Sequence, residues 1–198
     1  MAKQLGFYIE QEHCSGCTTC QIACKDKNDL AVGQLFRKVH ETAGGSYRRT
    51  GKVVTQDVYA FWLSLSCNHC NDPICVKNCP TGAMQKRLED GIVFVDQEHC
   101  IGCKICIKSC PYGAPQYNPK IKKMGKCDFC RDLLAEEKPP ACVAACPLRL
   151  IDYGPLDEIR QKHGSIDQVQ SMPSSELTHP SLVIKPHRDA VWGKEGRK

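Results

Sequence analysis

Cysteine is the residue type in this sequence whose spacing most plainly predicts chemistry. All 16 cysteines of the 198-residue chain fall into four groups of four. Two groups read C-x2-C-x2-C-x3-C, the third reads C-x2-C-x4-C-x3-C and the last reads C-x2-C-x11-C-x3-C. Segments 9–24 and 95–110 also share QEHC up to the first cysteine, so the pattern is an internal repeat.

Three kinds of site could use these thiols. Disulfides need an oxidising compartment and form poorly between cysteines separated by two residues. Zinc sites need two C-x2-C pairs with a longer stretch between them, which only the last group offers. A third cysteine two residues after the first pair suits a cuboidal iron–sulfur cluster. The spacing therefore predicts four [4Fe–4S] clusters, with these iron ligands: Cys14, Cys17, Cys20, Cys24, Cys67, Cys70, Cys75, Cys79, Cys100, Cys103, Cys106, Cys110, Cys127, Cys130, Cys142 and Cys146.

The fourth cysteine of such a run binds the other cluster of a pair. We therefore expect the first three cysteines on a loop and the fourth at the beginning of a helix that leads to the neighbouring site. Gly16 and Gly102 stand between the first two cysteines, where a missing Cβ lets the backbone approach the cluster. Pro80, Pro111 and Pro147 turn the chain away after the fourth cysteine.

Composition excludes several other functions. The formal net charge of +5 could suggest nucleic acid, but 16 thiolates and four cluster cores bring the holoprotein to about −3. We find no catalytic grouping of side chains and no nucleotide-binding loop, so we expect a chain that is not an enzyme. MAKQLGFYIEQEHC has no signal-peptide pattern, and no apolar run reaches membrane-spanning length.

Short elements separate the cysteine groups. We expect strands at 6–10, 91–96 and 53–66, the second in a hairpin over 87–96 with Asp90-Gly91 at its turn. Residues 31–52 read as a surface insertion. A short helix should begin at Arg131 and stop at Pro139-Pro140, and another should cover 154–164.

Beyond that helix, the tail to residue 198 is punctuated by Pro and Ser. We expect it to wrap across the protein, because Leu182, Val183, Ile184 and Trp192 would otherwise expose apolar surface.

Histidines and lysines near the cysteines have weaker roles in this interpretation. His69 lies inside CNHC, but four cysteines already complete that site, so we expect no histidine ligand. His13 and His99 precede a first cysteine and should pack or hydrogen-bond nearby. Lys104, Lys108 and Lys126 could raise cluster potentials locally, although solvated side chains are the ordinary interpretation for most of them.

The order of the groups, with SCNHCNDPICVKNCPTGAM, CIGCKICIKSCPYGAPQYN and KCDFCRDLLAEEKPPACVAACPLRLIDYG, resembles a known family. The chain is similar to the four-cluster ferredoxin-type subunits of molybdopterin oxidoreductases, and among them to the iron–sulfur subunits of dimethyl sulfoxide reductases. The resemblance implies a loop-rich α+β fold with two ferredoxin-like units of two clusters each, short β-hairpins and short helices. One unit would combine 1–30 with 120–153, the other would span 53–119, and 154–198 would be a helix and wrapping tail.

The resemblance also implies which cysteines share a cluster. One cluster would take Cys14, Cys17, Cys20 and Cys146, and its neighbour Cys127, Cys130, Cys142 and Cys24. A third would take Cys67, Cys70, Cys75 and Cys110, and the last Cys100, Cys103, Cys106 and Cys79.

The same resemblance implies a heterotrimer in anaerobic respiration. A molybdopterin-containing catalytic subunit would receive electrons through this chain from an integral membrane subunit that oxidises menaquinol. The complex would lie at the cytoplasmic membrane, on its periplasmic face after co-export with the catalytic subunit. The cysteines do not distinguish dimethyl sulfoxide from polysulfide, tetrathionate, selenate, nitrate or formate chemistry. A zinc-stabilised interaction module is the remaining alternative of another class.

Overall fold

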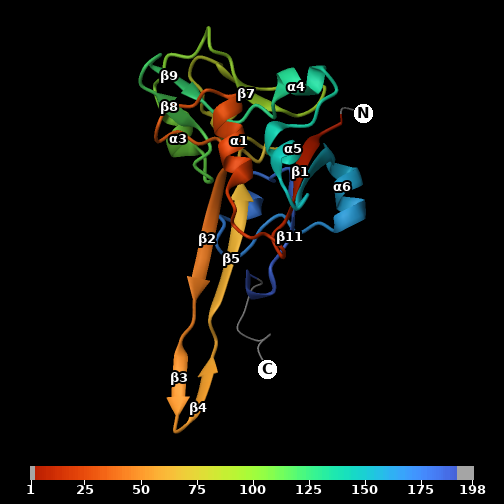
Figure 1. The fold of residues 1–198 in the computed structure, drawn as a ribbon. Coiled ribbons are helices and arrows are strands. Elements are labelled where there is room, and N and C mark those ends of the chain that lie inside the picture. The colour runs from red at the N-terminus through yellow and green to blue at the C-terminus, as the bar shows by residue number, and fades with distance from the viewer. Residues whose placement is uncertain (1–2, 191–198) are drawn as a thin grey trace.

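A body of short strands and helices carries a long projecting hairpin in the computed structural model, which describes residues 3–190 (Figure 1). The loop-rich α+β class predicted from the sequence is thus confirmed. The strands are β1 (Leu5–Glu10), β2 (Lys38–Gly44), β3 (Tyr47–Thr50), β4 (Val53–Gln56), β5 (Tyr59–Leu65), β6 (Met84–Lys86), β7 (Val93–Val95), β8 (Gln116–Asn118), β9 (Lys123–Gly125), β10 (Ile151–Pro155) and β11 (Leu182–Lys185). The helices are α1 (Thr19–Lys27), α2 (Ile74–Lys77), α3 (Ile105–Ser109), α4 (Arg131–Ala135), α5 (Ala141–Ala145), α6 (Leu156–His163) and the 3-10 turns η1 (Ser175–Leu177) and η2 (Arg188–Ala190).

Three strands from distant parts of the chain form the main sheet, in the order β10-β1-β11. Strand β1 pairs antiparallel with β10 and parallel with β11, so the C-terminal tail returns to the N-terminal strand. Leu182, Val183 and Ile184 of β11 are buried, as the wrapping tail predicted from the sequence requires. Trp192 lies outside the described residues.

Helix α6 follows β10 and lies against the same sheet. The predicted helix over 154–164 is confirmed, except that Pro155 is its N-cap rather than a residue of its first turn. Gly164 ends the helix with a φ of +86°, a backbone conformation that favours glycine. The buried face of α6 packs on Tyr8 and Val183. No helix within residues 3–190 is long and apolar enough to cross a bilayer.

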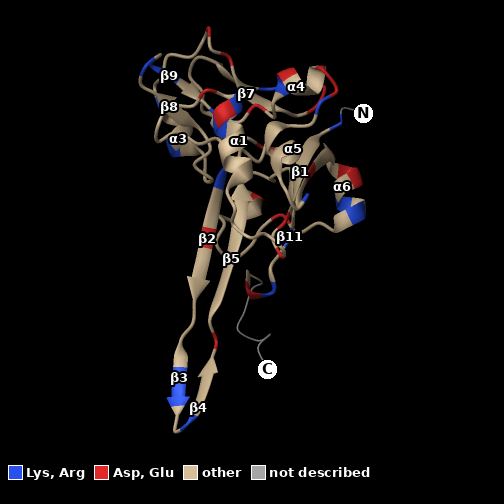
Figure 2. Cartoon of the chain, viewed as in Figure 1, with Lys and Arg blue, Asp and Glu red and all other residues tan. Residues whose placement is uncertain are grey.

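A hairpin arm projects from the body (Figures 1 and 2). Strands β2 and β5 pair at its base, and β3 and β4 pair beyond them. The predicted single strand over 53–66 is wrong, because the ladder breaks between Gln56 and Tyr59. Residues 31–52 supply one strand to each pair, so the predicted insertion and the strand after it form one structure. Gly45 sits at the break with a φ of +95°, and a Cβ there would lie 2.3 Å from the Asp57 carbonyl oxygen.

Two smaller hairpins, β6–β7 and β8–β9, complete the strands. The predicted hairpin over 87–96 exists in a longer form, because β6 pairs with β7 and residues 87–92 connect them. Arg87 holds this connection together through ion pairs with Glu89 and Asp90. Helix α4 ends at Ala135, before the predicted stop, and Pro140 instead caps the start of α5.

Cysteines are part of both larger apolar cores. The first core combines Phe7, Phe129 and Ile92 with cysteines of the first, second and fourth groups. The second combines Met84 and Met124 with cysteines of the second and third groups. Since thiols occupy the places that aliphatic side chains fill in other cores, whatever the thiols bind is part of the packing.

Candidate iron–sulfur sites

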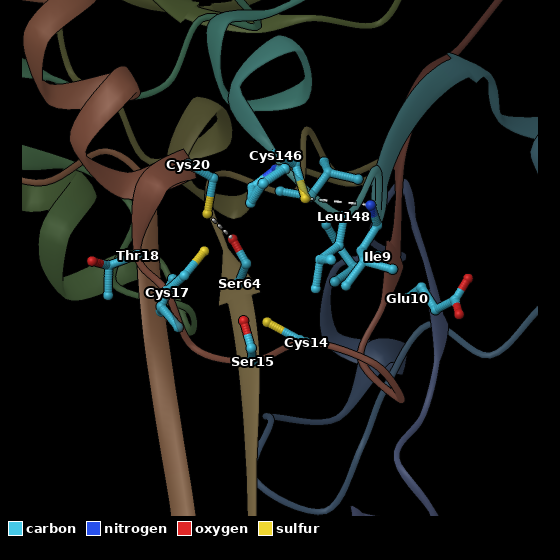
Figure 3. A pocket seen from close by; sticks show the side chains of 14 residues that line it. Ile9, Glu10, Cys14, Ser15, Cys17, Thr18, Cys20, Ser64, Cys146 and Leu148 are labelled. Atoms are coloured by element: carbon cyan, nitrogen blue, oxygen red, sulfur yellow. Dashed lines mark hydrogen bonds between the residues drawn. The ribbon is translucent and has the colours of Figure 1, made fainter.

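Four cysteines meet around one cavity beside the base of the arm (Figure 3). They come from the loop after β1, from α1 and from the end of α5. Ser64 of β5 lines the same cavity, and its hydroxyl lies 3.3 Å from the Cys20 sulfur. We call this cavity site 1, with Cys14, Cys17, Cys20 and Cys146.

A second cavity at the β6–β7 end of the body has the same kind of lining. Its four cysteines come from the loop before α3, from α3 itself and from the residue after the C-cap of α2. We call it site 4, with Cys79, Cys100, Cys103 and Cys106.

The other eight cysteines form two groups between these cavities. Repulsion between ionised thiols links Cys24 and Cys130 with Cys142, and it links Cys127 with Cys24, Cys67 and Cys142. It also links Cys70 and Cys75 with Cys67 and Cys110. We call the first group site 2, with Cys24, Cys127, Cys130 and Cys142, and the second site 3, with Cys67, Cys70, Cys75 and Cys110. The cavities of sites 1 and 4 are each lined by four cysteines that the family resemblance assigns to one cluster, and sites 2 and 3 are named by the same resemblance. Which cysteines share a cluster stays a prediction.

Each of four short helices directs one sulfur to each of two neighbouring sites. Helix α1 carries Cys20 and Cys24, which are four residues apart. The two cysteines that each of α2, α3 and α5 directs to its sites are also four residues apart. Four residues advance a helix by about 6 Å, so about one helical turn separates the two cysteine positions. Helices α1 and α5 pack together, as do α2 and α3. The expectation that the fourth cysteine begins a helix is wrong: Cys110 and Cys146 end theirs as C-caps, because the helix lies between the sites rather than beyond them.

The first two cysteines of each repeated run lie on a loop with left-handed residues. Gly16 has a φ of +70° and Gly102 a φ of +67°. A Cβ on Gly102 would lie 2.2 Å from the Lys122 carbonyl oxygen, and one on Gly16 would lie 2.6 Å from the Trp62 ring. These glycines thus allow other segments of the protein to approach the loop, which the sequence had suggested only for the cluster.

Hydrogen-bond donors already point at several cysteine sulfurs. The backbone N–H of Leu150 donates to the Cys146 sulfur at 3.3 Å in site 1. In site 4 the donors to Cys79 and Cys100 are the N–H groups of Met84 at 3.3 Å and Met124 at 3.4 Å. Such bonds stabilise a negatively charged sulfur and raise the reduction potential of a cluster that it holds.

The inner thiols are hard to ionise by themselves. Burial, with repulsion from neighbouring thiolates, raises the pKa of Cys24, Cys70 and Cys75 to about 12. A metal core bound to these sulfurs removes the proton outright. The sites therefore suit a positively charged core with several thiolate ligands.

The surroundings of Arg37 show whether the site residues fit an iron–sulfur cluster held by thiolates. Its side chain is 1% exposed and donates to the Ser64 carbonyl and hydroxyl and to the Ser66 hydroxyl. Within residues 3–190 no carboxylate forms an ion pair with it, and its Nε has no partner. Burial lowers its pKa, but the thiolates of Cys142 and Cys127 outweigh that effect and hold the pKa above its usual value. A buried cation needs an anion, and the thiolates of sites 1 and 2 are the anions at hand.

His13 and His99 hydrogen-bond nearby, as the sequence predicted. Nδ1 of His13 lies 2.5 Å from Glu10, and Nδ1 of His99 lies 2.7 Å from Asp96, so both hydrogen-bond on the surface. His69 is buried, and burial together with the charges of Lys126 and Arg37 lowers its pKa well below the usual value.

Of the three lysines considered from the sequence, one is buried near the sulfurs. Lys126 is 4% exposed and donates to the carbonyls of Val93 and Cys127. Lys104 lies 4.0 Å from the centre of the Tyr117 ring on the surface, and Lys108 is exposed. Arg37 and Ser64 were not found from the sequence, because nothing in segment 31–66 marks them as neighbours of cysteines.

Known proteins share this arrangement of residues. Residues 58–156 match the model of the 4Fe-4S dicluster domain family. The sequence is 51% identical over 190 residues to the B subunit of the anaerobic dimethyl sulfoxide reductase of Escherichia coli, and the match covers 96% of this sequence and 92% of that subunit. The protein belongs to this family of iron–sulfur electron-transfer subunits.

Other members of the family are also similar. The B subunit of the anaerobic dimethyl sulfoxide reductase of Haemophilus influenzae is 45% identical, over 95% of this sequence and 92% of its own. The thiosulfate reductase electron transfer subunit PhsB of Salmonella typhi is 37% identical, over 75% of this sequence and 74% of its own. The predicted family and cofactor are confirmed: the protein is an iron–sulfur subunit with four [4Fe–4S] clusters. The zinc and disulfide alternatives are not favoured.

Proposed function

We propose that sites 1 to 4 each hold one [4Fe–4S] cluster on the four cysteines named for it. The subunit then relays electrons through the four clusters in the order site 4, site 3, site 2, site 1. Every short helix directs one sulfur to each of two neighbouring sites, and this supports the order within the pairs 1–2 and 3–4. Repulsion between Cys127 of site 2 and Cys67 of site 3 supports the step between the pairs.

The main support for the relay is that a cysteine is exposed at each of its two ends. Cys17 of site 1 and Cys103 of site 4 are exposed. All the cysteines of sites 2 and 3 are buried except Cys110, which is partly so. A wire between two partner proteins needs this pattern, because partners reach only the outer clusters and water must be kept from the inner ones.

Each bound cluster supplies reversible uptake of one electron. The protein contributes fixed spacing through its helices and donors to the sulfurs. Buried Arg37 and Lys126 add positive charge near sites 1, 2 and 3. No group in this relay handles a substrate, so we assign the subunit no catalytic residue.

The two ends have different partners in this proposal. Site 1 faces a molybdopterin-containing catalytic subunit, and site 4 faces an integral membrane subunit that oxidises a quinol. Identity to two dimethyl sulfoxide reductase subunits supports that enzyme as the complex. The complex would lie at the cytoplasmic membrane on its periplasmic face. Similarity to PhsB supports thiosulfate reduction as a second candidate.

We further propose that the sites belong to two ferredoxin-like units. Residues 1–30 with 120–153 would hold sites 1 and 2, and residues 53–119 would hold sites 3 and 4. The separate packing of α1 on α5 and of α2 on α3 supports this division. Within this proposal we move the boundary at residue 120 to after Gly125, because β9 pairs with β8 and Met124 packs in the core of the second unit.

Replacing one exposed ligand at each end tests the order of the relay. In the purified complex, Cys103→Ser should slow electron entry, so that menaquinol reduces few of the clusters while added sulfoxide still reoxidises them. Cys17→Ser should slow exit, so that menaquinol still reduces sites 2 to 4 and sulfoxide no longer reoxidises them. Electron paramagnetic resonance (EPR) of the reduced clusters measures both. The reverse pattern would contradict the proposed direction, and equal effects would contradict the order.

A further inference from the structure

His69 occupies the place where the two cluster pairs meet. It lies between Cys67 and Cys70, in the loop of site 3, and its side chain is 1% exposed. Its backbone has a φ of +43°, which is uncommon for a residue other than glycine. Ser181 of the wrapping tail donates to its carbonyl at 2.9 Å, and Gln4 donates at 3.2 Å. Two distant segments therefore fix the position of one histidine.

The ring atoms of His69 have defined roles. The backbone N–H of Val93 donates to Nδ1 at 3.0 Å, so Nδ1 carries a lone pair and the ring proton is on Nε2. Nε2 lies 3.6 Å from the Cys127 sulfur, which belongs to site 2. A thiolate that binds iron has no proton to donate, so the hydrogen bond runs from His69 to the sulfur.

Aromatic rings hold the imidazole in this orientation. Phe129 packs against it edge to face, with ring centres 5.1 Å apart, and the Phe7 ring lies 6.5 Å away. Phe7 and Phe129 stack on each other at 4.1 Å. The ring cannot turn without losing the Val93 bond and this packing, so its Nε2 stays directed at Cys127.

We propose that His69 is a positioning residue that joins the two cluster pairs and tunes the potential of site 2. Its backbone belongs to the ligand loop of site 3, while its Nε2–H bonds a ligand of site 2. The bond stabilises the extra negative charge of the reduced state and so raises the potential of site 2. The path from Cys67 through the imidazole to Cys127 also gives electrons a bonded route between the pairs. This inference rests on the proposed assignment of Cys127 as an iron ligand.

Two amide substitutions separate tuning from simple packing. The amide of His69→Asn replaces Nδ1 and can accept from Val93, but it does not reach Cys127. The longer His69→Gln places its amide near the position of Nε2 and can donate to the Cys127 sulfur. Both remove the aromatic ring, so a purely structural role predicts the same effect for both variants.

The experiment is a redox titration of the assembled complex followed by EPR. Iron and sulfide content first shows whether each variant retains all its clusters. The signal of site 2 is identified in the unmodified complex as the one that changes in Cys130→Ser. A hydrogen bond to a charged acceptor changes an equilibrium by a factor of about ten or more. We expect His69→Asn to lower the ratio of reduced to oxidised site 2 about tenfold at fixed potential, which is about 59 mV for one electron.

His69→Gln should recover most of that shift, and sites 1 and 4 should stay unchanged in both variants. Equal shifts in the two variants, no shift in either, or a shift confined to another site would overturn the proposal. Failure of the ligand assignment is seen separately, because Cys130→Ser would then leave every EPR signal of the complex unaltered. If His69→Asn loses a cluster, the His69→Gln titration alone decides: a potential far below that of the unmodified complex contradicts the role.

Discussion

Replacing Arg37 should lower the reduction potentials of sites 1 and 2 more than those of sites 3 and 4. Its guanidinium is connected to site 1 by two hydrogen bonds in series. Nη1 donates to the Ser64 hydroxyl at 3.1 Å, and that hydroxyl lies 3.3 Å from the Cys20 sulfur. Since the same guanidinium forms no ion pair with a carboxylate among the described residues, its full charge acts on the clusters.

The size of the effect follows from Coulomb's law. Taking about 8 Å from the guanidinium to the nearest cluster and an effective dielectric constant of about 20, one charge contributes about 2 kcal/mol. For a single electron this energy equals about 90 mV. Arg37 is almost fully buried, so solvent screening does not reduce the value as it would on the surface. We therefore expect Arg37→Gln to lower the potential of site 1 by tens of millivolts, up to about 90 mV.

Two further variants make the prediction specific. Arg37→Lys keeps the charge and loses the fork of donors, so its potentials should stay nearer the wild type. Arg48→Gln removes an exposed charge on the arm and should shift nothing. The assay is an EPR redox titration of the complex, after iron analysis has shown that all clusters are present. Equal shifts in the Gln and Lys variants would refute the reasoning, because hydrogen bonding rather than charge would then be the cause.

Two predictions concern stability. Gly102→Ala must move the Lys122 carbonyl, whereas Gly113, with a φ of +62°, has nothing within 4 Å of an added Cβ. Gly113→Ala should lower the free energy of unfolding by about 1 kcal/mol through strain, and Gly102→Ala by about 1–3 kcal/mol more. The measurement is the guanidinium concentration at which the clusters bleach under anaerobic conditions. Similar midpoints for the two variants would contradict the close approach of the Lys122 carbonyl to Gly102. The β3–β4 end of the arm is exposed at every residue, and a two-stranded ribbon is marginally stable alone. Trypsin should therefore cut the isolated holoprotein first within residues 47–56 without iron loss, as mass spectrometry would show; a first cut in the body would count against an independent arm.

Local signals in the sequence predicted the local elements well. The helix over Leu156–His163 has acidic residues in its first turn and glycine after its last, and both act through the helix ends alone. The x3 spacing within each run of cysteines is local in the same way, since it reflects one turn of helix. Such features can be predicted without knowing which distant segments pack against them. Which runs share a cluster was implied only by the family resemblance and stays a prediction.

Features that depend on distant segments were not predictable in the same way. The run Leu182, Val183 and Ile184 signalled burial, but not that its partner would be β1 at the other end of the sequence. The break in the arm at Asp57 depends on how closely the opposite strand approaches at Gly45. The pattern of apolar residues does not reveal how closely the opposite strand approaches. Residues 53–66 were therefore predicted as one strand.

Arg37 shows why the surroundings of a cluster are harder to predict than its ligands. A ligand must be a cysteine at a fixed spacing, whereas any donor or cation can tune the sulfur if the fold brings it there. Clusters bound at neighbouring sites would repel each other's electrons, and this repulsion would hinder the reduction of both. A permanent cation between sites 1 and 2, and Lys126 between sites 2 and 3, offset that repulsion where it is greatest. The outer sites face partners and solvent, which screen their charge, so the buried cations lie inside the row of clusters and not at its ends.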